Sequence, residues 1–211
     1  MGRSRSDGNC TNRTTLVTAI SSVKLGARRL LRRAYDATCN FPDRMLHPRR
    51  HLAVQRRISR AARPQRILVV CHGNICRSPY LQAVLQRALP DLAVMSAGFF
   101  GSDRPVPAIA VALGAKRGLD LSRYRSRPLT QSTVGNADLV IVMDSYQAQQ
   151  VARTFATSRK RIVIAGDLDP QFEATRSITD PWSQSSDVFE SSFDRLDRCA
   201  ATLVGILQSR K

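Results

Sequence analysis

The sequence predicts an α/β fold in which a four-stranded parallel sheet carries helices on both faces. Short apolar runs alternate with longer segments whose apolar residues recur every three or four positions, as strands alternate with helices. The short runs are apolar throughout, which is typical of parallel strands buried on both faces. We predict that residues 1–64 form a basic N-terminal extension and that residues 65–211 form one domain.

The expected elements follow one another in regular alternation along the chain. The four expected strands share an aliphatic run: Ile67–Val70, Leu92–Ser96, Ala137–Met143 and Arg161–Ala165. The expected helices share a helical spacing of apolar residues: Pro79–Leu89, Pro107–Arg117, Thr130–Val134, Ser145–Phe155 and Ser186–Ser209. A long loop over Gly166–Ser185 precedes the last helix. Ligands of such sheets bind at the carboxyl ends of the strands.

Residues typical of helix ends flank these segments. Ser78 and Pro79 suit the cap and first turn of the first helix. Gly118 suits the position after the second helix, and Asp144 is expected to cap the helix that begins at residue 145. Apolar residues recur through the last segment and place Cys199 on its buried face, where we expect an inert thiol.

The net charge of +17 is concentrated near the N-terminus. Residues 1–66 contain 16 Lys and Arg against three acids, whereas residues 67–211 contain 17 against 13. We expect residues 1–13 to be disordered and residues 14–37 to be helical. Three interpretations of this helix stay open: a packed or solvated helix, a basic amphipathic helix on an anionic membrane surface, and a targeting sequence or nucleic-acid arm.

Residues 40–66 are rich in arginine and proline, and we predict a linker with at most a short helix near Leu52–Ala61. Phe41 is the only aromatic residue of this segment, so the interleaved aromatics of a single-strand binder are missing. No specific nucleic-acid binding is therefore expected. An alternative is that the native chain begins near Met45.

The cysteine pattern indicates a reducing, cytoplasmic setting. Five scattered cysteines do not suggest a disulfide framework. No Cys and His spacing fits zinc, and we expect neither a metal nor a cofactor. No apolar run reaches the roughly 20 residues of a membrane span.

The stretch Ile67–Pro79, ILVVCHGNICRSP, joins a strand end to a helix start. Such a loop points backbone N–H groups at one position and binds tetrahedral anions. The same field favours a Cys71 thiolate, and Arg77 can hold two phosphate oxygens. The nucleotide-binding pattern G-x-x-x-x-G-K-[ST] is absent. The expected phosphate-binding residues are His72, Gly73, Asn74, Ile75, Cys76, Arg77 and Ser78.

The loop residues have separate expected tasks. Gly73 allows close backbone approach, and Asn74 tolerates the left-handed conformation of a tight loop. Ser78 is expected to hydrogen-bond the thiolate, whereas the His72 side chain is expected to point outward. Cys76 lies five residues after the nucleophile, and a reversible disulfide between them is left open.

Thiolate attack on a phosphomonoester gives a phosphocysteine and expels an alkoxide or phenoxide, which needs a proton donor. Asp180, in T-D-P-W, is the expected donor, and Asp169, in L-D-P-Q, is its rival. Trp182 can wall a slot for an aromatic leaving group.

The segment V-C-H-G-N-I-C-R-S-P resembles the active-site loop of the low-molecular-weight protein tyrosine phosphatases. M-S-A-G at Met95–Gly98, A-D-L-V-I-V-M-D at Ala137–Asp144 and D-P-W at Asp180–Trp182 resemble that family's other landmarks, in the right order. The resemblance covers about Gln65–Lys211 and leaves the first 64 residues unmatched. It implies the low-molecular-weight phosphatase fold and a protein-tyrosine-phosphatase activity.

The resemblance also implies residue roles. Cys71 would be the nucleophile, Arg77 the ligand of the phosphate and the transition state, and Asp180 the general acid and then base. Ser78 would stabilise the thiolate and Asn74 would hold the loop's shape. Cys76 would be the redox partner.

The expected substrate pocket contains Ile75 and Trp182. Ile75 matches tyrosine phosphatases, whereas relatives that act on phosphoarginine carry Thr there. Trp182 stands where the family usually has Tyr or another aromatic residue. The loop after Gly98 departs from the family's pocket wall, which we expect Phe99 and Phe100 to supply.

The expected partner is a phosphotyrosine protein. Bacterial members of the family commonly act on tyrosine autokinases that control exopolysaccharide export. A weak contact of the N-terminal arm with anionic membrane is a further expectation. Two alternatives stay open: a thiol-dependent arsenate reductase, which needs cysteines downstream where only Cys199 exists, and a phosphate-binding adaptor that uses the basic arm.

Overall fold

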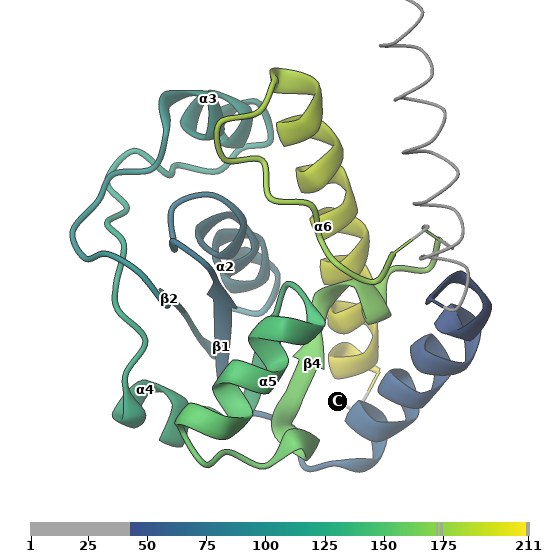
Figure 1. Cartoon of the computed structure of the whole chain (residues 1–211). Helices are drawn as coiled ribbons and strands as arrows, with labels where there is room; N and C mark the ends of the chain where they lie inside the picture. Colours follow the sequence, from purple (N-terminus) through teal and green to yellow (C-terminus); the bar gives the residue numbers. More distant parts are fainter. Residues whose placement is uncertain (1–42, 172, 174, 210–211) are drawn as a thin grey trace, which may run out of the picture. The chain divides into compact units, whose positions relative to one another are not determined.

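The computed structural model describes residues 43–171, 173 and 175–209. Its centre is a four-stranded parallel sheet with the order β2-β1-β3-β4, as Figure 1 shows in part. The strands are β1 (Arg66–Cys71), β2 (Ala93–Gly98), β3 (Leu139–Val142) and β4 (Ile162–Ile164). The predicted parallel sheet is confirmed.

The predicted helices of the domain are also confirmed, with shifted ends. They are α2 (Arg77–Ala88), α3 (Ala108–Lys116), α4 (Gln131–Gly135), α5 (Ser145–Thr154) and α6 (Ser186–Gln208). Short 3-10 turns cover Arg159–Arg161 and Ala165–Leu168. As predicted, Asp144 caps α5 by accepting the Gln147 N–H at 2.7 Å.

Ser78 does not cap α2, so this part of the prediction is wrong. The helix begins two residues before Pro79, and the residue that precedes it, Cys76, makes no side-chain cap. The Ser78 hydroxyl lies inside the first turn and is fully buried. The reason is that the tight loop winds directly into the helix, which leaves the hydroxyl to the site described below.

Alternate residues of each strand enter two separate cores. On one face, Ile67 and Val69 of β1 pack with residues of α2, α3 and α6. On the other face, Leu68 and Val70 pack with Val134 and Val151 of α4 and α5. Because each face is covered, both alternating sets are apolar, which explains the unbroken apolar runs of the sequence.

Residues 43–60 form a helix, so the predicted linker over this part of the chain is wrong. Val54 and Ile58 lie one turn apart and are buried in the same core as α2 and α6. His47 Nε2 lies 2.9 Å from the Asp169 carbonyl oxygen, and His51 Nδ1 lies 3.0 Å from that of Asp167. The prolines and arginines of this segment favoured a linker, but the four-residue spacing of Val54 and Ile58 is that of a helix with one buried face.

The residues from Asp43 onward form one compact unit that includes the helix over 43–60. The segments predicted as disordered (1–13) and helical (14–37) lie outside the described residues. None of the helices in the described ranges is long and apolar enough to cross a bilayer.

Substitution of Ile58 tests whether the helix over 43–60 is a structural part of the domain. We expect Ile58→Ala to lower the free energy of unfolding by about 2–5 kcal/mol, because a buried aliphatic side chain leaves a cavity. Leu52→Ala, on the same helix but half exposed, is the matched control and should change it by less than about 0.5 kcal/mol. If urea denaturation gave the same change in the free energy of unfolding for Ile58→Ala and Leu52→Ala, the helix would not pack on the core.

Candidate active site

The loop between β1 and α2 holds the Cys71 thiol at the carboxyl end of the central strand. Cys71 is the last residue of β1 and is buried. Its Sγ accepts the Asn74 backbone N–H at 3.2 Å and the Ser78 hydroxyl at 3.0 Å. Two donors that converge on one sulfur stabilise its charged form. The expected hydrogen bond from Ser78 is therefore present.

Asn74 is the structural centre of the loop. Its φ of 51° is the predicted left-handed conformation. The side-chain amide donates to Ser78 Oγ at 2.8 Å and Ser96 Oγ at 3.0 Å. Its oxygen accepts from the Tyr124 hydroxyl at 2.9 Å and the Arg127 N–H at 2.8 Å. This buried side chain thus ties the loop to β2 and to the segment before α4.

The guanidinium of Arg77 lies under the carboxylate of Asp180. Arg77 is buried, and its NH1 donates to the Ile178 carbonyl oxygen at 3.0 Å. Its NH2 pairs with the Asp180 carboxylate, whose other oxygen accepts the Trp182 N–H at 3.2 Å. Two predicted residues that lie 103 positions apart are therefore brought together, at the carboxyl edge of the sheet.

A cavity of about 250 Å³ opens above the loop. Cys71, His72, Gly73, Ile75, Cys76, Arg77, Phe100, Arg104, Asp180 and Trp182 line it. Phe100 and Trp182 are both more than half exposed, so they form the outer wall as expected. Phe99 was expected in this wall, but it packs against the core beneath α4 and α5 instead. Consecutive residues of an extended segment point to opposite sides, and only one of the pair can reach the cavity.

Arg104 is a site residue that the sequence reasoning missed. Its NH2 donates to the carbonyl oxygens of Gly73 at 2.8 Å and Phe100 at 3.1 Å. A Cβ on Gly73 would lie 2.7 Å from this guanidinium nitrogen, so Gly73 leaves room for Arg104. Arg104 stands in the loop that departs from the family pattern, and no local motif marked it.

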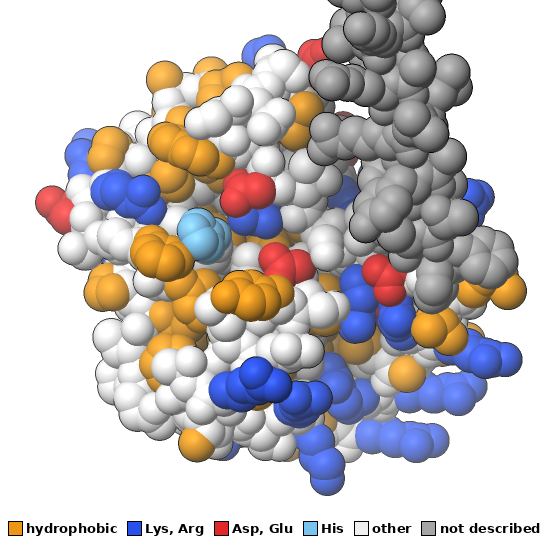
Figure 2. All heavy atoms as spheres, viewed as in Figure 1, with side chains coloured by type: hydrophobic (Ala, Val, Ile, Leu, Met, Phe, Trp, Pro, Cys, Tyr) orange, Lys and Arg blue, Asp and Glu red, His pale blue; other side chains and the backbone are white. Residues whose placement is uncertain are grey.

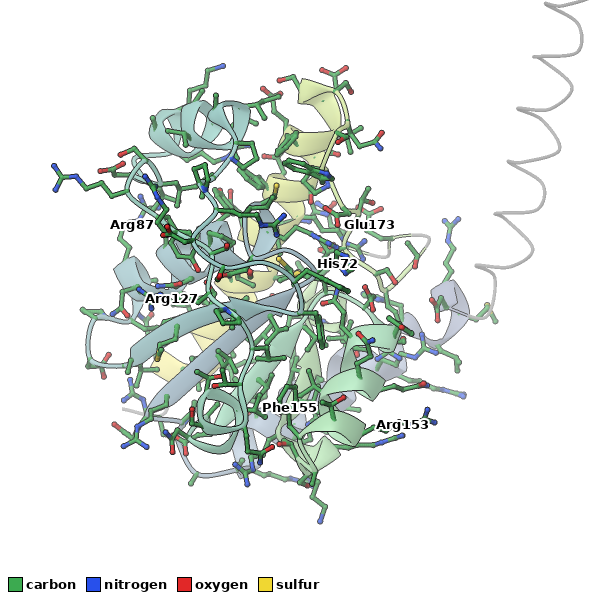
Figure 3. The ribbon with its side chains drawn as sticks, turned by 60° about the vertical axis from the view of Figure 1, so that its left-hand side comes forward. His72, Arg87, Arg127, Arg153, Phe155 and Glu173 are labelled. Carbon is green, nitrogen blue, oxygen red and sulfur yellow. The ribbon has the colours of Figure 1, made fainter. Side chains whose placement is uncertain are left out.

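His72 agrees with the expectation for its side chain, whereas the redox role expected for Cys76 stays a prediction. His72 is exposed on the loop (Figure 3), and the centre of its ring lies 4.5 Å from that of Phe100. Cys76 is a buried free thiol. Burial and the nearby Cys71 and Asp180 raise its pKa to about 12, so it stays protonated at neutral pH. Cys199 is buried in the core, as predicted.

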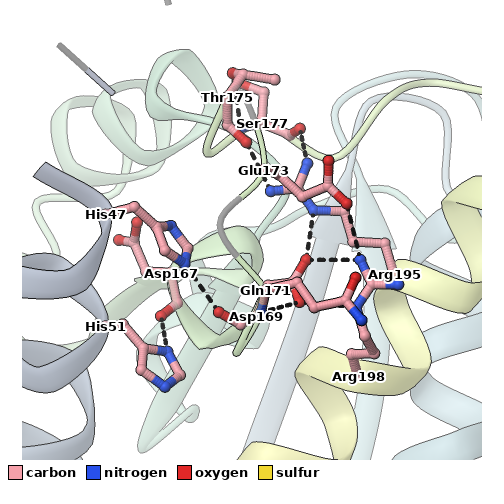
Figure 4. A network of polar contacts seen from close by, with 10 residues as sticks. All are labelled: His47, His51, Asp167, Asp169, Gln171, Glu173, Thr175, Ser177, Arg195 and Arg198. Carbon is pink, nitrogen blue, oxygen red and sulfur yellow. Dashed lines mark hydrogen bonds and ion pairs between the residues drawn. The ribbon is translucent and has the colours of Figure 1, made fainter. Parts of the chain in front are cut away.

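Asp169, the rival proton donor, is held in a structural ion cluster (Figure 4). It is fully buried, and its carboxylate pairs with Arg195 at 3.0 Å and Arg198 at 2.9 Å. Burial alone would raise the pKa of Asp169, but the hydrogen bonds and charges of Arg198 and Arg195 hold it below the usual 3.8. Asp169 does not line the cavity above Cys71, so its position does not support the role of proton donor.

The ion cluster predicts a pH-dependent stability. We expect Asp169→Asn to lower the free energy of unfolding by about 3–5 kcal/mol at neutral pH, because two arginines lose their buried partner. The depressed pKa means that this contribution is present above pH 3.8 and is lost as the pH falls through the folded value. The difference between the two proteins in urea denaturation should therefore shrink in acid.

Glu173→Gln is the control for this prediction. Glu173 pairs with Arg198 from a part-exposed position, so its loss should cost less than about 1 kcal/mol. An Asp169→Asn chain as stable as Glu173→Gln at neutral pH would contradict a structural role for the cluster.

Comparisons with known proteins agree with this geometry. The model of the family "low molecular weight phosphotyrosine protein phosphatase" matches residues 66–211. A protein from Ralstonia nicotianae described as "probable low molecular weight protein-tyrosine-phosphatase EpsP" is 38% identical over 133 residues, which cover 63% of this chain and 88% of the relative.

Solved structures show the same fold. The Erwinia amylovora tyrosine phosphatase AmsI matches with a TM-score of 0.65 and 30% identity, over 69% of this chain and 95% of that one. The arginine phosphatase YwlE from Geobacillus stearothermophilus matches with a TM-score of 0.64 and 27% identity, over 70% and 95%.

The matched residues contain the whole sheet, the loop from Cys71 to Ser78 and the Asp180 loop, and they leave out the helix over 43–60. The resemblance of the active-site loop and the fold it implies are thereby confirmed. The chain belongs to the low molecular weight phosphotyrosine protein phosphatase family.

Proposed function

We propose that this protein-tyrosine phosphatase hydrolyses phosphotyrosine in proteins through a phosphocysteine on Cys71. The observation that carries the proposal is the convergence of three groups in one cavity. A thiol with two hydrogen-bond donors on its sulfur, a buried guanidinium and the carboxyl that pairs with this guanidinium all line it. These are the nucleophile, the phosphate ligand and the proton donor that the reaction needs.

In the first step, the Cys71 sulfur attacks the phosphorus and the bond to the phenolic oxygen breaks. Arg77 holds two equatorial phosphate oxygens and stabilises the charge of the transition state. The phosphate thus replaces the Asp180 carboxylate as the anion on Arg77. Asp180, on the exposed side of the cavity, is placed to give its proton to the departing phenoxide.

In the second step, water attacks the phosphocysteine and the sulfur–phosphorus bond breaks. Asp180, now ionised, takes the proton of that water. Inorganic phosphate leaves, and Cys71 returns to a thiolate stabilised by Asn74 and Ser78. The backbone N–H groups of the loop from His72 to Ser78 complete the phosphate site in this proposal.

The cavity walls support a phosphotyrosine substrate. Ile75 lines the cavity with Phe100 and Trp182, and an aromatic ring fits between apolar and aromatic surfaces. Phosphoarginine relatives carry Thr at the position of Ile75, where a hydroxyl offers a hydrogen-bond partner to a guanidinium. Arg104 adds positive charge near the loop, which repels a guanidinium substrate and favours an acidic peptide.

A substrate panel tests this proposal. We expect kcat/KM for a phosphotyrosine peptide to exceed that for phosphoarginine or a phosphoserine peptide by about 100-fold or more. Of the three substrates, only phosphotyrosine has an aromatic ring that can pack against Ile75, Phe100 and Trp182. Trp182→Ala should lower kcat/KM for the phosphotyrosine peptide by about 3- to 30-fold and leave the thiol chemistry intact. Equal rates on all three substrates, or faster turnover of phosphoarginine, would reject the assignment.

Four further parts of the proposal concern the substrate protein, the location, redox regulation and membrane contact. We propose a tyrosine autokinase of exopolysaccharide export as the substrate protein, as the resemblance implies, and a cytoplasmic location. Cys71 and Cys76 are proposed as a redox pair: peroxide converts the Cys71 thiolate to a sulfenic acid, and the Cys76 thiol displaces water to form the disulfide. A weak contact of the basic N-terminal arm with anionic membrane completes these proposals.

A further inference from the structure

A second cavity of the described domain is larger than the one above Cys71. It has a volume of about 410 Å³ and lies between the helix over 43–60, the start of α5 and the edge strand β4. It shares no lining residue with the catalytic cavity of about 250 Å³. One of its walls comes from residues outside the 66–211 matched by the family model.

Positive charge surrounds this cavity. Its lining includes Arg50, Arg57, Arg159 and Arg176 but only one carboxylate, that of Asp167. Figure 2 shows lysine and arginine side chains gathered on the lower part of the molecule, where Figure 1 places α5, β4 and the helix over 43–60. An excess of guanidinium groups around a concave surface attracts an anion.

Two of these four arginines form ion pairs with carboxylates of the described residues, and the other two do not. Asp167 pairs with Arg176, with an oxygen 3.0 Å from its Nε, and Asp43 pairs with Arg50 at 2.5 Å. Among the described residues, no carboxylate forms an ion pair with Arg57 or Arg159.

Arg57 is the more buried of the two unpaired arginines. Its NH2 donates to the Ile162 carbonyl oxygen at 2.8 Å, which fixes the side chain beside the edge strand. Burial lowers the pKa of Arg57 despite the charge of Asp167. A bound anion would compensate this partly desolvated cation.

The remaining lining of the cavity is largely aliphatic. Val54, Ala148, Ile162 and Ile164 contribute to it, and Ala53 lies at its exposed wall. A cavity of several hundred Å³ with an apolar lining and a few charged groups is suited to a small organic molecule. The planar guanidinium matches phosphate better than other anionic groups of that size, because it can bind two oxygens at once.

We propose that this cavity binds an organic phosphate of about nucleotide size. Its phosphate groups contact Arg57 and Arg159, and its less polar part lies on the aliphatic lining from Val54 to Ile164. The site is independent of the proposed hydrolysis, because it uses none of the residues around Cys71.

Calorimetric titration of ATP into the full-length chain tests the proposal, with inorganic pyrophosphate as a second probe that lacks an apolar part. The titrations use an Arg77→Ala background, so that the catalytic loop does not compete for phosphate. We expect one bound ATP, held more tightly than pyrophosphate. Arg57→Gln with Arg159→Gln should weaken ATP binding at least about ten-fold.

Arg56→Gln with Arg153→Gln is the matched control. It removes the same charge from the same two parts of the chain, but both arginines are exposed and neither lines the cavity. Arg153 points away from α5 in Figure 3. The control should change ATP binding less than about two-fold at constant ionic strength.

Two more variants keep the result interpretable if Arg57→Gln unfolds the chain. Arg159→Gln alone removes an exposed side chain and should weaken ATP binding about three-fold or more. Ala53→Phe fills the cavity from its exposed wall without a change in charge, and it should also weaken ATP binding. Melting temperatures identify any variant that fails to fold.

Three results would overturn the proposal. The first is no heat of ATP binding in the Arg77→Ala background. The second is equal weakening by the cavity variants and the control, which would mean attraction by net charge alone. The third is a phosphotyrosine peptide that binds the cavity more tightly than ATP, since the ligand would then be a protein segment.

Discussion

Cys71→Ser is expected to lower kcat on p-nitrophenyl phosphate by about 10⁴-fold or more. A serine hydroxyl at this position has almost the same size and would accept the same hydrogen bonds from Asn74 and Ser78. It is a far weaker nucleophile, because the loop contains no general base in contact with it that could remove its proton. Steady-state kinetics with the purified full-length chain measure the effect.

The Cys71→Ser variant should lose phosphoester hydrolysis but still bind phosphate. Inorganic phosphate should still bind the loop, and the melting temperature should change little, because Arg77 and the loop backbone are unchanged. Cys199→Ala is the control: Cys199 lies on the buried face of α6, away from the cavity above Cys71, so its loss should leave kcat within about two-fold. Full activity in Cys71→Ser would reject Cys71 as the nucleophile.

Asp180→Asn is expected to lower kcat on a phosphotyrosine peptide by about 10²- to 10⁴-fold, because the amide cannot protonate the phenoxide. The change preserves the side-chain shape and an acceptor for the Trp182 N–H. The loss should be smaller on p-nitrophenyl phosphate, whose phenoxide leaves readily without a proton. The comparison of the two substrates separates a proton donor from a residue that only shapes the loop.

Asp187→Asn provides the charge-matched control for Asp180→Asn. Asp187 is an exposed acid in the first turn of α6 and does not line the cavity, so its kcat should stay near that of the wild type. If Asp169→Asn folded but had a greatly reduced kcat, and Asp180→Asn kept full activity, Asp180 would not be the proton donor. The buried ion cluster around Asp169 makes the opposite result the expected one.

The parts of the fold that were predictable are those set by local pattern. Aliphatic runs located the four strands of the sheet, and the residues around Cys71 and Arg77 located the loop between β1 and α2. The left-handed backbone conformation of Asn74 was also predictable, because asparagine tolerates a positive φ, and the structure shows that conformation. In the sequence, the neighbouring Trp182 favours Asp180 over Asp169 as the proton donor, and in the structure the burial of Asp169 favours Asp180 more strongly.

The parts that escaped prediction depend on contacts between distant segments. Nothing adjacent to Arg104 or Tyr124 shows that they reach Gly73 and Asn74 across the fold. The helix over 43–60 carries a short apolar repeat among arginines and prolines, and its burial against the domain decides its structure. Local propensity is a weak guide where such packing decides the outcome.

Trapping of the covalent intermediate tests the central claim most directly. The Asp180→Asn chain is mixed with a phosphotyrosine peptide, quenched within the first turnover and digested, and the fragments are analysed by mass spectrometry. The mechanism predicts one phosphoryl group on the sulfur of Cys71, with Cys76 unmodified. A phosphoryl group on any other residue, or turnover by the wild type with no phosphorylated fragment under the same quench, would contradict it.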